Sequence, residues 1–442
     1  MSQTVITIIG GAVGFAIGGP QGARVGMMVG ATLGAALYPP EAQGGPTSLG
    51  PLGFTAAHTG QVLPIVYGRT RVPGTLIWYS IVDSGGGKKG GTGGDDRRMA
   101  IALAEGQVGS LLTLWSQGDE LDLGALDYSF YTGTGVQTAD ALITANLAVG
   151  QVDCAYPHVC YFVIGATTES YLTFEVARTT ADVAAGNPAI AALGLDAYPE
   201  DVNGDMNPVV CLADFMTHPR YGLGLAATDL HTASWIEEAA YASYMELFCS
   251  PTLDTAQPGT AHIEHLLSYF DGMLGYSQGT FHLHSRRSPS RENLPYTQIQ
   301  PWEWLDGYVP KFGRGSERQV ANLVTVEYRN RADAYNTAPT ERRDDWDIGR
   351  RGIYREQLYL NGVTTAVVAD RITSKLLWSR ITGPKTVEWG MGPAGVWYEP
   401  LILVSFEMIG AAAYALEGSI YRIVKITENP DGTFIFAGVE ER

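Results

Sequence analysis

Glycine occupies every fourth position near the start of this chain. The glycines concerned are Gly10, Gly14, Gly18, Gly22, Gly26, Gly30 and Gly34. On a helix of about 3.6 residues per turn, residues four apart lie nearly above one another, so these positions form a groove without side chains. Each glycine costs roughly 1 kcal/mol against alanine in a helix interior, and Pro20 interrupts one turn. Such a helix needs a partner, so residues 1–45 are predicted to form a helical glycine-zipper leader that packs on like helices or enters lipid.

Other interpretations of this leader fit less well. A flexible Gly/Ala leader would not place Val, Ile, Met and Leu between regularly spaced glycines. A secretory signal begins with basic residues, whereas the first charge here is Arg24, in the middle of the apolar run. The same arginine leaves residues 5–23 as only a borderline membrane span.

Composition and charge indicate an acidic, folded protein. The 442 residues are 45% hydrophobic and 17% charged, which is typical of two or three globular domains. A net charge of −17 excludes a general affinity for nucleic acid, because phosphates are neutralised by clustered Lys and Arg. The four cysteines are too few for a disulfide framework and contain no C-x-x-C pair, so they suit synthesis in a reducing cytosol.

The order of local patterns predicts a mainly β protein with an α/β middle section. A Pro/Gly-rich linker ends near residue 46, and strand-like segments follow it up to about residue 178. Residues 46–200 are therefore assigned to a first β domain. Within it, residues 61–83 and 97–121 are each expected to form two strands.

Residues 201–301 are predicted to form a small α+β domain. Its first helix is expected to stop at Pro219. A second helix is expected to begin with Thr232 or Ser234 as its N-cap, and a third precedes a return to strand alternation.

Residues 302–442 return to strand patterns and are assigned to a second β domain. One helix, at about 364–380, interrupts the strands. The string NPDGT before the final strand predicts a hairpin turn, with glycine where a positive φ is needed.

The sequence offers no candidate for catalysis, for a metal or for a cofactor. The Gly-rich loop at 85–94 lacks the Lys-Ser/Thr pair of a phosphate-binding loop. Two histidine pairs, one on an expected helix and one on an expected strand, lack the further ligands of a metal site; they are His262 with His265 and His282 with His284. The carboxylates of residues 343–347 are expected to form a solvated charge patch in a polar loop. No G-x-S-x-G is present, and no paired acids stand out for glycoside cleavage.

Several strings, taken in order, resemble one protein family. The first is LPIVYGRTRVPGTLIWYS, which contains Tyr67 and Gly68, and the most recognisable is NPVVCLADFMTHPRYGLGL. The motif residues of the second string are Asn207, Pro208, Arg220, Tyr221, Gly222 and Gly224. With the 85–94 loop and the ending SIYRIVKITENPDGTFIFAG, they resemble the tail-tip or baseplate hub proteins of tailed bacteriophages, as in the N-terminal part of the lambda-type host-specificity protein. The resemblance covers about residues 50–440.

This resemblance implies a homotrimer in which two tube-forming β-barrel hub domains per subunit make a pseudo-six-fold ring that continues the tail tube. The chain would be a non-enzymatic structural protein of the virion tail tip, made in the host cytoplasm. The implied partners are its own copies, the tail tube or distal tail protein, the tape-measure protein, other tail-tip and fibre proteins, and DNA in transit. An acidic lumen would let DNA slide. The long C-terminal part of the lambda-type protein is unmatched, so host recognition is expected to lie with other tail proteins.

The glycine zipper has a place in this scheme. Three such segments are expected to pack about the threefold axis and plug the tube, to contact the tape measure, or to enter the host membrane. Two alternatives remain, a tail-associated hydrolase of cell wall or surface polymer and a membrane pore built from the leader.

Overall fold

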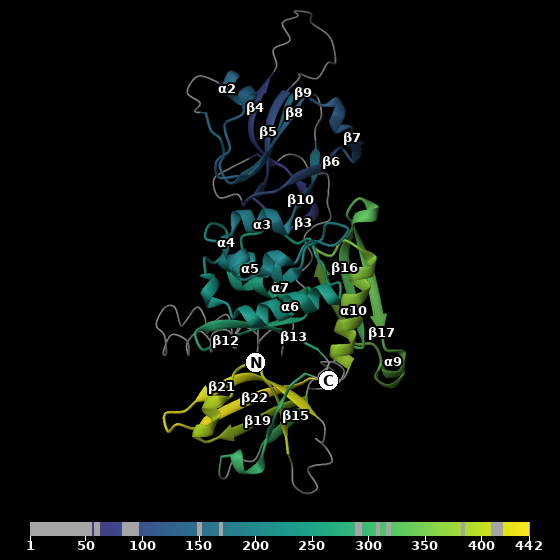
Figure 1. The fold of residues 1–442 in the computed structure, drawn as a ribbon. Coiled ribbons are helices and arrows are strands. Elements are labelled where there is room, and N and C mark those ends of the chain that lie inside the picture. The colour runs from purple at the N-terminus through teal and green to yellow at the C-terminus, as the bar shows by residue number, and fades with distance from the viewer. Residues whose placement is uncertain are drawn as a thin grey trace, which may run out of the picture.

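The structure, a computed structural model, describes residues 55–56, 62–81, 97–147, 153–167, 171–287, 294–305, 310–314, 320–381, 385–407 and 419–441. The predicted glycine zipper and the 85–94 loop lie outside these residues. The described parts stack along one long axis (Figure 1): two β-sheets at one end, a helical middle with a small sheet beside it, and a curved sheet at the other end.

The first β part consists of two sheets, with strand orders β1-β4-β5-β9-β8 and β3-β10-β6-β7. Phe162 of one sheet and Phe174 of the other meet in the core between them, with ring centroids 5.2 Å apart. Trp78 and Tyr161 lie in a second cluster with Ile143 of the helix α2. The elements are β1 (Thr55–Ala56), β3 (Gly68–Pro73), β4 (Thr75–Ile81), β5 (Arg97–Glu105), β6 (Ser110–Ser116), β7 (Asp119–Leu121), β8 (Tyr128–Thr132), α2 (Ala141–Ala145), β9 (Val159–Thr167) and β10 (Leu172–Arg178).

The middle part packs several helices around one buried helix. Every residue of α5 (Pro208–Thr217) is buried, because neighbouring helices cover it on all sides. The neighbours are α3 (Thr180–Gly186), α4 (Pro188–Ala192), α6 (Thr232–Tyr244) and α7 (Gly259–Ser268), followed by the hairpin β12 (Gly272–Ser277) and β13 (Thr280–Ser285). The short strand β2 (Ile65–Val66) comes from the first part and pairs with β11 (Thr252–Leu253) of the middle.

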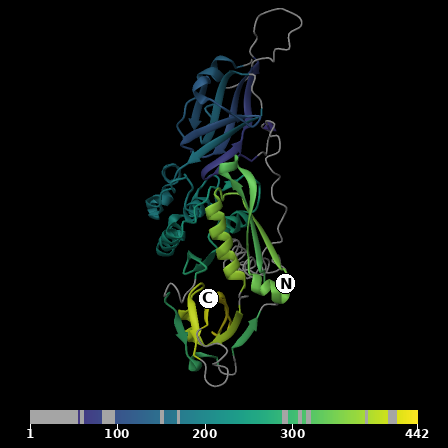
Figure 2. The ribbon, with the colours of Figure 1, turned by 90° about the vertical axis from the view of Figure 1, so that its right-hand side faces the viewer.

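A three-stranded sheet of order β17-β16-β18 completes the middle core. Its strands are β16 (Leu323–Asn330), β17 (Asn336–Arg343) and β18 (Arg355–Leu360), joined by α9 (Asp345–Arg351). Val324, Val326 and Tyr328 alternate on β16 and belong to the same buried cluster as the helices of the middle. The long helix α10 (Ala366–Ile381) lies against this sheet (Figure 2).

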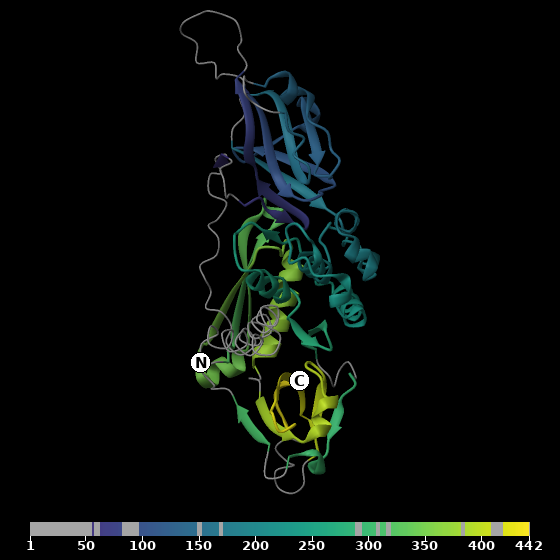
Figure 3. The same ribbon diagram turned by 90° about the vertical axis from the view of Figure 1, so that its left-hand side faces the viewer.

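The C-terminal sheet has six strands in the order β14-β20-β21-β22-β19-β15 and curves strongly (Figure 3). It takes strands from two separate stretches: β14 (Thr297–Ile299) and β15 (Lys311–Arg314), and then β19 (Lys385–Met391), β20 (Leu403–Phe406), β21 (Ile420–Glu428) and β22 (Phe434–Glu441). The short helix η7 (Pro393–Trp397) follows β19. Trp389 stacks on Phe436, with ring centroids 5.1 Å apart, in a core separate from that of the middle.

The prediction of a mainly β chain with an α/β middle is confirmed, while the closed tube-forming barrels remain a prediction. The expected helix at about 364–380 is found as α10, and Gly432 has a φ of 77° in the expected hairpin turn. Residues 302–442 do not form one β unit, because β16–β18 and α10 share the core of the middle. None of the helices in the described part of the chain combines the length and apolar character of a membrane span.

Several local predictions were wrong in detail. Residues 61–83 and residues 97–121 each contain three strands rather than the expected two. The N-cap of α6 is His231, whose side chain accepts from Ser234 N, and not Thr232 or Ser234.

The expected polar loop at 343–347 is also different. It runs into α9, and Asp347 is buried there. The buried carboxylate accepts from Arg351 Nε at 2.8 Å and from Asn322 Nδ2 at 3.0 Å.

Candidate functional site

A buried polar cluster joins the first β part to the middle; we call Tyr67, Arg178, Asp214 and Tyr221 the Arg178 cluster. Both phenol groups donate to Asp214 Oδ2, at 2.9 Å from Tyr67 and 2.6 Å from Tyr221. Arg178 Nη2 donates to the Tyr221 hydroxyl at 2.6 Å and lies 3.7 Å from Asp214 Oδ2. The side chains of Arg178 and Asp214 are 1% and 0% exposed, so the ion pair is sealed from solvent.

Burial governs the protonation of this cluster. Desolvation and the neighbouring Asp214 raise the pKa of Tyr67, and burial also raises the pKa of Tyr221. Burial opposes the charge of Arg178, but Tyr221 and Asp214 hold the pKa of its guanidinium above the ordinary value. The cluster is therefore an ion pair bridged by neutral phenols, which suits it to fixing two elements together rather than to moving protons.

The motif glycine Gly222 lets the chain fold back over the end of α5. Gly222 N donates to His218 O at 3.1 Å, and Leu223 N donates to Phe215 O at 3.0 Å, which satisfies carbonyls that the helix leaves free. A Cβ on Gly222 would stand only 2.1 Å from Phe215 O. This position therefore requires glycine.

The other residues of this motif complete the same turn. Gly224 has a φ of 67°, which favours glycine. Arg220 forms an ion pair with Glu105 at the end of β5. His218 stacks on Tyr221 with ring centroids 3.6 Å apart, and burial lowers the pKa of its imidazole. The turn thus attaches the end of α5 to the first β part.

Asn207 and Pro208 start α5 and hold it against α6. Asn207 Oδ1 accepts from Val209 N at 2.9 Å as the N-cap, and Pro208 stands at the first helical position, where it lacks no needed donor. The Asn207 amide also donates to Ala239 O at 2.8 Å and to Ser243 Oγ at 3.0 Å. One side chain therefore both caps one helix and binds its neighbour.

A second buried cluster joins the middle to the three-stranded sheet; we call Asp205, Ser250, Arg331 and Thr364 the Asp205 cluster. Thr364 Oγ1 donates to Asp205 Oδ2 at 2.8 Å, and the Ser250 hydroxyl and Arg331 both bind Asp205 Oδ1. Burial raises the pKa of the Asp205 carboxyl, and Arg331 opposes that rise. Arg331 Nη2 also donates to Arg69 O at 3.1 Å, so the cluster reaches the first β part.

Gly68 allows this close approach. Its φ is 62°, and a Cβ at this position would lie 2.2 Å from Ser250 Oγ. The next residue binds the same oxygen, since Arg69 N donates to Ser250 Oγ at 2.9 Å. A side chain at Gly68 would separate β3 from the Asp205 cluster.

Glu175 on β10 extends the same contact. It accepts from Arg69 Nε at 2.7 Å, from the Tyr335 hydroxyl at 2.6 Å and from Thr113 Oγ1 at 3.0 Å. Burial opposes its charge, but the hydrogen bonds from Arg69 and Tyr335 hold the pKa of Glu175 below its ordinary value. Tyr335 lies just before β17, so this carboxylate binds the three-stranded sheet to the first β part.

We expect Tyr335→Phe to lower the free energy of unfolding by about 1.5–3 kcal/mol, because it removes a hydrogen bond to a buried carboxylate. Urea unfolding would measure the loss. Tyr79→Phe is the matched control, since Tyr79 is 62% exposed, and it should change stability by less than about 0.5 kcal/mol. Equal stability of the two variants would contradict this role of Tyr335.

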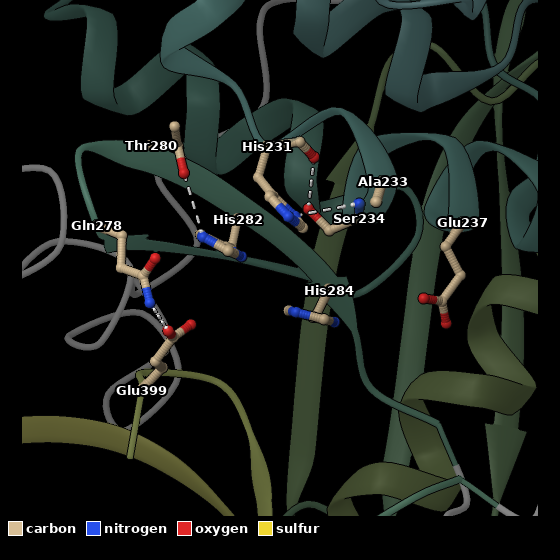
Figure 4. Close-up of a pocket in the computed structure, with 9 residues that line it drawn as sticks. All are labelled: His231, Ala233, Ser234, Glu237, Gln278, Thr280, His282, His284 and Glu399. Carbon is tan, nitrogen blue, oxygen red and sulfur yellow. Dashed lines mark hydrogen bonds between the residues drawn. The ribbon is translucent and has the colours of Figure 1, made fainter. Parts of the chain in front are cut away.

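The joint between the middle and the C-terminal sheet is different, because it contains a cavity of about 520 Å³. Figure 4 shows His231, His282 and His284 around it; we call these three residues the histidine joint. His231 and His282 stack with ring centroids 4.1 Å apart, and His284 Nδ1 lies 3.9 Å from Glu238 Oε1. Polar groups, rather than a shared apolar core, therefore meet at this joint.

The sequence predictions located part of these joints. Tyr67, Gly68, Asn207, Pro208 and Tyr221 were singled out as motif residues, and the structure brings Tyr67 and Tyr221 onto one carboxylate. Arg178, Asp205, Asp214 and Arg331 were missed. One signal was present for Asp214, a single carboxylate in the apolar run of α5. Among the described residues, no group of three His, Cys, Asp or Glu side chains is placed to hold a metal ion.

Comparison with known proteins supports the family resemblance. Residues 258–424 match the family described as putative phage tail protein. No curated protein matches the sequence. A chain of the virion of a native gene transfer agent particle is similar in structure, with a TM-score of 0.65 and 19% identity over 98% of this chain and 96% of that chain.

Two bacterial prophage or tail proteins are matched more distantly. The 43 kDa tail protein of prophage MuSo2 from Shewanella oneidensis has 12% identity and a TM-score of 0.31, over 86% of this chain and 98% of its own. The tail protein from Neisseria meningitidis MC58 has 10% identity and a TM-score of 0.33, over 86% and 96%. The chain thus resembles phage tail proteins, by sequence over residues 258–424, and it shares the fold of a gene transfer agent virion protein over almost its whole length.

Proposed function

We propose that this chain is a structural protein at the distal end of a bacteriophage-type tail, a homotrimeric hub whose sheets continue the tail tube. The observation that carries the proposal is the pair of buried clusters that join the first β part, the helices of the middle and the three-stranded sheet. A wall segment must keep its shape under load, and sealed ion pairs between parts give that rigidity. The match of residues 258–424 to phage tail proteins supports the setting.

The implied partners follow from this position. They are the tail tube or distal tail protein, the tape-measure protein, neighbouring tip and fibre proteins, and DNA in transit. The net charge of −17 suits passage of DNA, because an acidic wall does not retain phosphates. The glycine-zipper leader remains the proposed plug or membrane-contacting segment.

A structural role also fits the chemistry of the clusters. Arg178 and Asp214 are sealed from solvent, and each binds groups of its own chain. A hydrolase would need an acid or nucleophile that a polymer substrate can reach. The two clusters are therefore proposed to hold the fold and not to act on a substrate.

The mass of the full-length protein and the symmetry of its rings test the proposal. Light scattering is expected to give three times the chain mass of 47.5 kDa, and electron microscopy is expected to show threefold rings with a central channel. A stable monomer at all concentrations, or particles without a channel, would contradict the hub assignment.

A further inference from the structure

The C-terminal sheet meets the middle without sharing a hydrophobic core with it. Across the joint, Gln278 Nε2 donates to Glu399, and the backbone at Gly275 packs so closely on Leu401 that a Cβ there would lie 2.7 Å from Leu401 Cδ1. Parts of a chain that have separate cores tend to move relative to each other unless a large hydrophobic interface joins them.

The charged groups around the histidine joint come from every element that packs there. The helix α6 contributes Glu237 and Glu238, the residues after β13 contribute Arg287, and the C-terminal part contributes Glu399 and Arg422. The two arginines lie close enough to His284 to disfavour its protonation. A neutral His284 imidazole is therefore part of this arrangement.

The carboxylates of the joint are already engaged by other groups. Glu238 binds Arg287 and accepts from Ser285 Oγ at 2.7 Å, while Glu237 accepts from Arg287 Nη1 at 3.2 Å. Glu399 accepts from Gln278. An imidazolium formed in the closed joint would have to compete for these partners.

We propose that the histidine joint is an acid-sensitive hinge, which keeps the C-terminal sheet against the middle while His282 and His284 are neutral and releases the sheet when these two imidazoles are protonated. Figure 4 shows the arrangement on which the hinge depends, with His282 and His284 on one strand and Glu399 across the cavity. This inference does not depend on the trimer, because every group belongs to one chain.

The direction of the pH effect follows from linkage. Burial and the nearby Arg422 lower the pKa of His284 to about 3, and burial and His231 lower the pKa of His282. A histidine with a lowered pKa in the closed state favours closure above its free pKa of about 6.5, and that advantage is lost as the pH falls. As the pH falls from 7.5 to 5.0, His284 therefore shifts the equilibrium toward the open state.

Distance measurements on the full chain test the hinge. Spin labels would be attached to Val202→Cys, 102% exposed in the middle, and Val396→Cys, 62% exposed beside the C-terminal sheet, in a Cys154→Ser background that removes the exposed native thiol. We expect one narrow distance distribution at pH 7.5 and a second, reversible population at pH 5.0. An identical distribution at both pH values would overturn the proposal.

Two variants distinguish the effect of His282 and His284 on opening from the effect of other titrating groups. His282→Gln/His284→Gln is expected to stay closed at pH 5.0. The control His158→Asn changes an exposed histidine of the first β part, and asparagine tolerates its φ of 65°. The control should respond like the parent protein. A double variant that opens as readily as the parent would overturn the proposal.

Hydrogen exchange on the unsubstituted chain gives an answer even if the double variant does not fold. After correction for intrinsic rates, exchange at pH 5.0 should rise in residues 272–285 and 399–404 and stay constant in α5. An equal rise in α5 would indicate global unfolding and would overturn the hinge.

Discussion

Asp214→Ala is expected to lower the free energy of unfolding by about 3–5 kcal/mol, because it leaves Arg178 as a buried charge without its counter-ion. The same change also removes the acceptor of Tyr67, Tyr221 and the Asn187 amide, which donates to Asp214 Oδ1 at 2.9 Å. Equilibrium unfolding in urea would measure the loss.

Two further substitutions serve as comparisons for the loss of stability in Asp214→Ala. Asp214→Asn keeps an acceptor oxygen without the charge, so its loss should be smaller than that of Asp214→Ala. Asp254→Ala removes an exposed carboxylate and should change stability by less than about 0.5 kcal/mol. If Asp214→Ala lost less than about 1 kcal/mol, the Arg178 cluster would not be the fixed joint described above.

Gly222→Ala is expected to destabilise the protein by about 3 kcal/mol or more, or to prevent folding. The added Cβ would lie 2.1 Å from Phe215 O and 2.8 Å from His218 O, and both are backbone atoms that cannot rotate away. Thermal unfolding and soluble yield would show the effect. Gly186→Ala is the matched control, since a Cβ at Gly186 meets nothing within 4 Å and helix propensity favours alanine by up to about 1 kcal/mol. Similar behaviour of the two variants would contradict the close packing at Gly222.

The sequence predicted those helices and turns that are determined by residues within one short stretch. The helix α5 was expected because its apolar residues, the preceding Asn207 and Pro208, and the following Pro219 stand within one short stretch. The final hairpin turn was expected from its glycine, and Gly432 does have a positive φ. The motif residues after α5 were singled out from the family resemblance, and their partners were not predicted.

Contacts between residues far apart in the sequence could not be predicted from such local patterns. Arg178 and Asp214 lie on different elements, and Arg331 reaches Asp205 from a separate sheet, so no spacing rule relates them. The cap at His231 was missed because histidine is an uncommon N-cap, and here its ring also stacks on His282 of a later strand. The insertion of β16–β18 and α10 between strands of the C-terminal sheet was also missed, because the pairing of strands far apart in the sequence cannot be recognised from local residue patterns.

The two-stretch origin of the C-terminal sheet affects how the protein is made. Ile299 of β14 pairs with Phe406 of β20, so the first strand leaves the ribosome long before its neighbour exists. At about 5–20 residues per second, that delay is on the order of ten seconds. The middle core receives its last segment, α10, before β19 to β22 are made, while β14 and β15 still lack their partner strands. The sheet therefore forms last, and a chain whose translation stops early would present an unfinished edge to any neighbour that selects complete subunits.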